Sequence, residues 1–283
     1  MNPTVVAVRA GLWRGWIELR QSFSSGQDLF SQFFWPVLTL GALFFLRNGS
    51  FEASGLTLGA LALPGVVGMM IAFNGMFAMA GYLTMDREDG TLLRAKATPN
   101  GMVGYLIGKI TVASATVLIQ VTIILGLGSL IVGGVHLDSA RAWFTLIWVL
   151  ALGLLAVLPL GAAIGSLFDN PRGIGFLSFP IMGLVAISGI FYPITAMPGW
   201  LQGVAQVFPI YWLGLGMRSA MLPGDAAAVE LSESWRGLET AAVLGLWAVA
   251  GLVLAPIFLR RMARRESGSS VAARREKAIQ RGY

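Results

Sequence analysis

The chain has 283 residues, of which 56% are hydrophobic and only 12% are charged, with a formal net charge of +6. Soluble domains carry about 25% charged residues, so this composition excludes an ordinary soluble domain and indicates a membrane protein. The chain has no cysteine and a single histidine, which excludes a disulfide framework, a thiolate metal site and a histidine-rich metal centre.

Residues 1–25 are predicted to form an interfacial helix at the membrane surface. Trp13 and Trp16 contribute to its apolar side, but Arg9 and Arg20 fall on the same side and would have to snorkel. The first long apolar run starts only near Leu29, too late for a cleaved signal peptide, and is interpreted as a retained first span.

The hydrophobic pattern predicts an all-α polytopic membrane protein with six transmembrane helices. Each predicted span approaches or exceeds the ~20 residues needed to cross a bilayer. The predicted spans are Leu29–Leu46, Leu56–Leu83, Met102–Val132, Ala142–Phe168, Gly173–Ile194 and Glu239–Leu259.

The segment Asp86–Pro99 places six charged residues between the second and third predicted spans. A compact mixed-charge segment between two apolar runs is typical of a surface presented to an aqueous partner. A merely solvated loop is the alternative interpretation.

The span centres carry no formal charge, and their polar residues, such as Asn74 and Gln120, are neutral. Lys109 lies near the inner end of the third span, where we expect it to snorkel to the interface. An ion-coupled carrier is therefore disfavoured, because such proteins use intramembrane charges. The string Gly104–Ile110 lacks the spacing of a P-loop, and no catalytic motif is found, so the subunit is predicted to be non-catalytic.

Basic residues predict the orientation of the chain. With both termini inside, only Arg47, Arg141, Arg218 and Arg236 of the twenty Lys and Arg residues lie outside. The segment Gly199–Leu222 is apolar enough to be a seventh span, but a seventh crossing would invert this bias. Pro209 in its middle favours two short helices, predicted to form an outer re-entrant hairpin over residues 195–223. Residues 260–283 are predicted to be a basic cytoplasmic tail.

Two segments resemble the ABC-2-type permeases, the membrane subunits of ATP-driven exporters that include daunorubicin-resistance-like drug exporters and polysaccharide exporters. Arg87–Leu92, followed by Ala97-Thr98-Pro99 and Gly108-Lys109, is similar to the family's E-R-E-x-G-T-L…T-P…G-K region. Ser188–Pro193, followed by Met197–Gln202, Pro209 and Arg218, is similar to its S-G-x-x-x-P…M-P-x-W-L-Q…P…R signature. The chain departs from the first pattern at Asp86 and has alanines at 95 and 97, where leucines are common.

The resemblance implies a single transmembrane domain over residues 1–259, in a permease dimer that binds two cytoplasmic ABC ATPase subunits. Residues 1–25 would be the elbow helix and residues 86–98 a coupling helix docked on the ATPase. ATP and magnesium would bind on the ATPase, with no cofactor or metal on this chain and no nucleic-acid partner. The expected coupling residues are Asp86, Arg87, Glu88, Gly90, Thr91, Leu92 and Leu93.

We expect the chain to move an amphipathic, drug-like or lipid-like molecule outward across the cell membrane. The membrane expected is the bacterial cytoplasmic membrane. A substrate path is expected at Phe73, Asn74, Met76, Phe77 and Gln120. Lipid-facing packing and, for Asn74 and Gln120, interhelical hydrogen bonding are the alternatives.

An outer gate is expected at the aromatic residues Phe191, Tyr192, Trp200, Phe208, Tyr211 and Trp212. Anchoring of these rings in the aromatic belt is the alternative. The competing functions are export of a polysaccharide or glycolipid, ion-coupled carriage, and a membrane biogenesis role without transport.

Overall fold

The structure is a computed structural model, and the residues that it describes are 2–51, 56–168, 171–190, 193–265, 267–269 and 276. The fold is helical apart from a two-residue antiparallel ladder between β1 (Ser50–Phe51) and β2 (Leu56–Thr57). The main helices are α1 (Pro3–Ser22), α2 (Gly26–Leu46), α3 (Leu58–Glu88), α4 (Thr91–Lys96), α5 (Gly101–Val132), α6 (Ala140–Gly165), α7 (Pro171–Gly175), α8 (Ser178–Ile187), α9 (Gly199–Val207), α10 (Pro209–Met221) and α11 (Gly237–Arg265).

Five of these helices, α2, α3, α5, α6 and α11, are long and apolar enough to cross a membrane. Three of them begin at a side-chain cap: Ser25, Thr57 and Ser139 each accept a hydrogen bond from a backbone N–H three residues on. Five of the predicted spans are therefore confirmed as helices, and the protein is a multi-pass membrane protein.

The predicted fifth span, Gly173–Ile194, is broken. Its helical parts are α7 and α8, separated by a turn at Phe176–Leu177. Pro180 lies in the first turn of α8, where its missing N–H costs no helical hydrogen bond. With ten residues, α8 is about 15 Å long, half of the ~30 Å hydrocarbon core.

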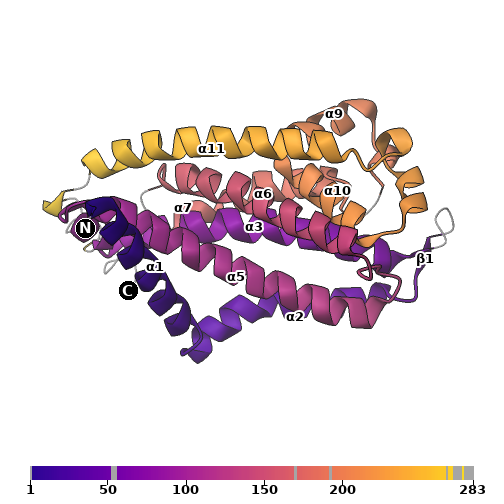
Figure 1. Cartoon of the computed structure of the whole chain (residues 1–283), viewed down its shortest axis with the longest axis horizontal. Coiled ribbons are helices and arrows are strands. Elements are labelled where there is room, and N and C mark those ends of the chain that lie inside the picture. The colour runs from indigo at the N-terminus through magenta and orange to yellow at the C-terminus, as the bar shows by residue number, and fades with distance from the viewer. Residues whose placement is uncertain are drawn as a thin grey trace.

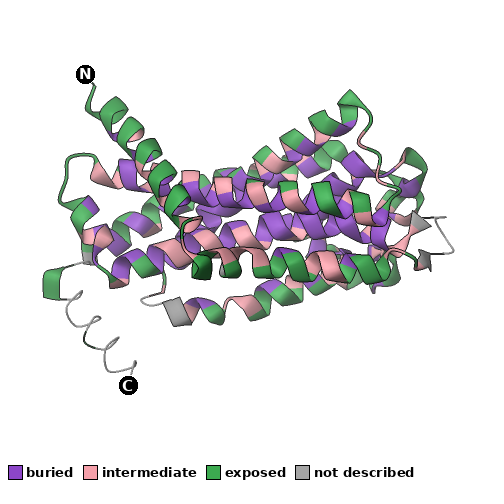
Figure 2. Cartoon of the chain, turned by 90° about the horizontal axis from the view of Figure 1, so that it is seen from below, coloured by how far each residue is buried: buried purple, intermediate pink, exposed green. Residues whose placement is uncertain are grey.

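The core of the bundle is α3, which packs against α5, α6 and α10. Figure 2 shows the resulting contrast between buried central helices and exposed outer ones. Glycines permit the closest approach: a Cβ at Gly161 of α6 would lie 2.5 Å from the Met76 carbonyl oxygen of α3.

The segment Gly199–Leu222 forms two short helices, α9 and α10, as Pro209 predicts. They separate at Phe208, because a residue before proline avoids the helical conformation. Nearly all of α10 is buried against α3, α6 and α11.

The bundle has two distinct ends (Figure 1). We call one the α4 end, where the N-terminus and the last turns of α11 also lie. The other, the η end, carries the β1–β2 ladder and the short 3-10 helices Ile194–Ala196, Gly224–Val229 and Leu231–Glu233. Helix α11 continues to Arg265, so residues 260–265 of the predicted tail are helical.

Candidate functional site

The charged segment after α3 forms a tight turn and a short helix. Gly90 has φ 78°, a left-handed conformation that glycine adopts without strain, and it reverses the chain between α3 and α4. The Asp89 carboxylate accepts a hydrogen bond of 2.7 Å from the Thr91 backbone N–H. The separate helix spans only Thr91–Lys96, since Asp86–Glu88 belong to the last turn of α3.

Asp86 and Lys109 form the centre of a buried ion network at the α4 end. The Lys109 Nζ lies 2.9 Å from Asp86 Oδ2 of α3 and 2.8 Å from Glu18 Oε2 of α1. The lysine side chain is only 6% exposed, so the prediction that Lys109 snorkels to the interface is wrong. Two carboxylates and the rings of Tyr82 and Tyr105, 5.2 and 5.8 Å away, hold its ammonium inside the protein.

Glu18 connects this network to the outer side of α1. It also accepts a hydrogen bond of 2.9 Å from the Arg14 guanidinium, one helical turn before it. Burial by itself raises the pKa of Glu18, but the hydrogen bonds and positive charges of Lys109 and Arg14 outweigh burial and hold that pKa below its ordinary value. Glu18 is thus an ionised bridge between two cations.

Two further cations of this segment cap the ends of other helices. Arg87 donates hydrogen bonds of 3.3 and 2.6 Å to the Ser166 and Phe168 carbonyls after α6. Lys96 donates one of 2.7 Å to the Ala263 carbonyl in the last turn of α11. Free carbonyls at helix C-termini carry partial negative charge, so cations stabilise them. Together, Asp86, Arg87 and Lys96 tie one short segment to α5, α6 and α11, and Lys109 connects it further to α1.

The predicted coupling residues divide into an inner and an outer group. Asp86 and Arg87 are buried, and Leu92 is 1% exposed, so its side chain packs inside the chain instead of facing a partner. Glu88, Thr91 and Leu93 are half-buried. Gly90 is buried at the turn. Its most open side chains up to residue 96, Asp89, Arg94 and Lys96, form its outer edge together with the preceding Met85.

The structure brings together the polar residues of the expected substrate path. Asn74 Nδ2 donates to Gln120 Oε1 at 2.7 Å, and Gln120 Nε2 donates to the Gln32 carbonyl at 3.2 Å. The predicted interhelical hydrogen bond is thus confirmed, and it joins α3 and α5 to α2. Phe73 and Phe77 stack at 4.4 Å, whereas Met76 is buried where α3 meets α6. Contact with a substrate stays a prediction for these residues.

The expected gate aromatics have different environments. Trp200 on α9 is 70% exposed, whereas Tyr211 and Trp212 on α10 are buried. Trp212 donates to the Gln206 carbonyl at 2.7 Å, and Phe208 stacks on Trp247 at 6.1 Å. Phe191 and Tyr192 lie outside the described residues. A gating role stays a prediction.

Sequence reasoning missed a second buried ion pair, at the η end. Arg218 Nε donates to Glu230 Oε1 at 2.5 Å, and Arg218 also donates to the Gly189 carbonyl at 3.1 Å. Both side chains are 4% exposed. The only signal was that an acidic residue follows Arg218 at a short distance in a loop.

Comparison with known proteins assigns this chain to a family. A family model described as ABC-2 type transporter matches residues 6–222, which cover α1 to α10. The chain belongs to the ABC-2 type transporter family. It is therefore a membrane subunit of an ABC transporter.

Curated relatives agree with this assignment. The chain is 26% identical over 149 residues to a protein named "Probable multidrug ABC transporter permease YbhR" from Escherichia coli K12. The same identity and length hold for the protein of that name from Escherichia coli O157:H7. Each match covers 52% of this chain and 39% of the relative, so the chain spans well under half of their length.

Proposed function

We propose that this ABC-2 permease is the membrane subunit of an ATP-driven exporter that moves an amphipathic, drug-like or lipid-like molecule outward across the cytoplasmic membrane. In this proposal both termini and α4 lie in the cytoplasm. Two ATPase subunits bind ATP and magnesium and dock on α4, and a second permease copy or paralogue completes the pathway.

The observation that carries the proposal is the set of contacts made by the segment Asp86–Lys96. Its outer edge is open to a partner, while Asp86, Arg87 and Lys96 bond to α5, to the chain just after α6 and to α11, and Lys109 extends the link to α1. Leu92 and Ala95 anchor α4 in the core. A push on the outer edge therefore moves α1 and α5 through Asp86, α6 through Arg87, and α11 through Lys96.

The substrate class is supported by α3, whose partly buried Phe73 and Phe77 lie among methionines. Methionine side chains adapt to ligands of varied shape. The multidrug relatives agree in name. A polysaccharide path would be expected to carry more polar and aromatic lining residues. The buried charges at the α4 end are paired with one another and do not follow a path across the bundle. This arrangement favours a structural role for them over the ion-coupled carrier.

Co-purification tests the docking role. Glu88→Arg reverses the charge of a half-buried residue that is in none of the ion pairs described above, and is expected to abolish co-purification of the ATPase subunit. The matched control is Asp138→Arg, which makes the same change on an exposed loop at the η end and should leave the complex intact. Equal yields of ATPase with both variants would contradict docking at α4.

Transport direction and substrate need a second measurement. ATPase activity of the reconstituted complex should rise with amphipathic compounds from a chemically diverse panel, and uptake into inside-out vesicles should require ATP. Transport driven by a proton gradient without ATP would contradict the exporter.

A further inference from the structure

Helix α1 has one face that is closed by the protein. Ala7, Gly11, Gly15 and Leu19 recur at every fourth residue and are buried against α5. A Cβ at Gly11 would lie 2.4 Å from the Gly104 carbonyl oxygen, so the two backbones are in direct contact. The remaining faces of α1 need another partner or solvent.

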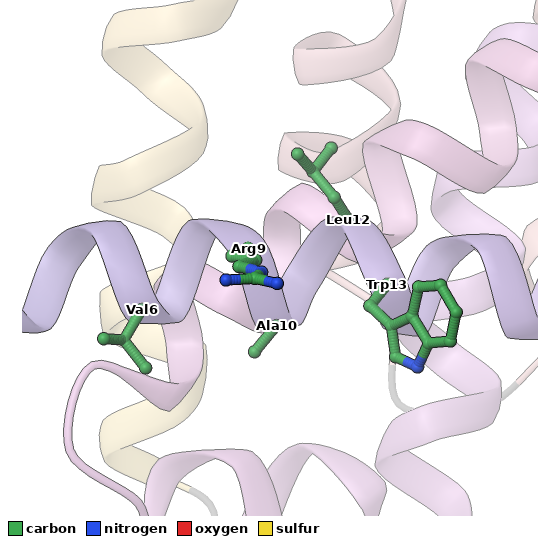
Figure 3. Close-up of a pocket in the computed structure, with 5 residues that line it drawn as sticks. All are labelled: Val6, Arg9, Ala10, Leu12 and Trp13. Atoms are coloured by element: carbon green, nitrogen blue, oxygen red, sulfur yellow. The ribbon is translucent and has the colours of Figure 1, made fainter.

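A stripe of two arginines and two tryptophans lies outside this contact. Arg9, Trp13, Trp16 and Arg20 follow one another at spacings that place them on one side of a helix. The two indoles are 67% and 56% exposed, and both arginines are exposed. We call these four residues the Arg–Trp stripe. Figure 3 shows its first half, with Arg9 and Trp13 projecting from α1 and Leu12 pointing to the other side from Ala10.

The two guanidinium groups of the stripe differ from their neighbour Arg14. Arg14 is bound to Glu18. Within the described ranges, no carboxylate pairs with Arg9 or Arg20. Open hollows flank the stripe along its length, one lined by Arg9 and Trp13 and the next by Trp13, Trp16 and Arg20. The stripe therefore offers unpaired positive charge beside exposed indole rings.

We propose that the Arg–Trp stripe binds the phosphate headgroups of anionic phospholipids. Guanidinium groups bind phosphate oxygens bidentately, and tryptophan prefers the depth of the headgroups. Arg9 and Arg20 are eleven positions apart, or about 16 Å along the helix, so the two arginines reach different lipid molecules.

The position of α1 in the chain selects a lipid over a protein partner. α1 ends at Ser22, and the spanning helix α2 starts at Gly26, so the end of the stripe lies where a span enters the bilayer. The last turns of α11, which carry the exposed Arg260, Arg261 and Arg264, lie at the α4 end together with the N-terminus. An anionic lipid surface complements this cationic end of the protein, and juxtamembrane basic residues bind such surfaces.

Energy transfer from tryptophan to labelled lipid tests the site. The purified full chain in detergent is titrated with phosphatidylglycerol and with phosphatidylcholine that carry the same dansyl-labelled acyl chain. We expect tighter binding of phosphatidylglycerol, and a loss of affinity for it of about five-fold for each arginine replaced in Arg9→Gln/Arg20→Gln. Arg9→Lys/Arg20→Lys should retain most of the affinity, because the charge is kept.

Two controls locate the lipid. The chain has seven other tryptophans, so Trp13→Phe/Trp16→Phe should lower the transfer without abolishing it. Arg260→Gln/Arg261→Gln, which removes as many charges from α11, should keep the wild-type transfer. The thermal unfolding midpoint checks that each variant is folded.

Equal wild-type affinity for both lipids would overturn the proposal, as would unchanged phosphatidylglycerol affinity in Arg9→Gln/Arg20→Gln. If that variant kept its lipid affinity and lost only the co-purified ATPase, the stripe would be a binding surface for the ATPase instead of for lipid. Neither result bears on docking at Glu88, so the proposed transport function would stand or fall separately.

Discussion

Lys109 connects three helices through ion pairs. Its ammonium bonds to carboxylates of α1 and α3, and its own backbone belongs to α5. Removing one partner of a buried ion pair costs about 3–5 kcal/mol, because the other charge stays buried without compensation. Replacing all the partners together avoids that penalty.

Lys109→Met is therefore expected to destabilise the protein by about 3 kcal/mol or more, since it leaves Asp86 without its cation and Glu18 with Arg14 alone. Thermal unfolding in detergent should show a clearly lower midpoint. The triple variant Glu18→Gln/Asp86→Asn/Lys109→Met leaves no unpaired charge in the buried centre, only the part-exposed Arg14 without its carboxylate, and should recover much of the loss. A single Lys109→Met variant as stable as wild type would show that the network carries little energy.

Glu18 makes this network sensitive to acid. Because its folded pKa lies below its unfolded pKa, ionised Glu18 stabilises the fold at pH values above about 4.3, the ordinary value for glutamate. That stabilisation is lost as the pH falls through the lower, folded pKa. The unfolding midpoint of wild type should fall more steeply in acid than that of Glu18→Gln. Asp138→Asn, on an exposed loop, should follow the wild-type curve.

The sequence shows residue types but not long-range partners. Lys109 and Asp86 lie near the ends of predicted spans, where a snorkelling lysine and a solvated acid are the ordinary expectations. Their pairing with Glu18 depends on how α1 crosses α5, which no periodicity reveals. Asn74 and Gln120 were predictable as partners, because a polar group at mid-depth needs another one.

At the scale of elements, the crossing of α1 and α5 depends on glycine. Gly11 and Gly15 of α1 face Gly104 and Gly108 of α5, and each backbone contacts the other. The Gly104-Gly108 spacing was visible in the sequence, but its partner helix was not, because such spacings arise easily in a chain with 36 glycines.

Gly11→Ala should therefore weaken this crossing. The added methyl would meet a backbone oxygen at 2.4 Å, and overpacking of this kind costs about 1–3 kcal/mol. The control is Gly126→Ala in α5, where a Cβ meets nothing within 4 Å and helix propensity favours alanine by about 0.5–1 kcal/mol. The unfolding midpoint should fall for the first variant and hold or rise for the second. Identical midpoints would mean that the backbones separate without cost.

Element boundaries followed from composition wherever a span was long and uniformly apolar. The predicted fifth span was the exception, because hydropathy averages over the turn at Phe176–Leu177, which lies between Gly175 at the end of α7 and Pro180 in the first turn of α8. The reverse holds at Pro209, where a single proline correctly divided α9 from α10.

For the whole molecule, the distribution of basic residues predicts that the α4 end faces the cytoplasm. The chain has no cysteine, so single cysteines report accessibility without background. Ala97→Cys lies at the α4 end and Ala140→Cys at the η end, and both positions are exposed. In intact cells, a membrane-impermeant maleimide should label Ala140→Cys, and should label Ala97→Cys only after permeabilisation. The opposite pattern would invert the orientation.

The bonds from Arg87 and Lys96 end on main-chain oxygens of Ser166, Phe168 and Ala263. Any amino acid at those three positions presents the same carbonyl, so evolution can exchange their side chains without disturbing the contact. Homologues should therefore vary at these positions independently of Arg87 and Lys96. Covariation between aligned sequences would then not detect the hydrogen bonds that connect the segment Asp86–Lys96 to α6 and α11.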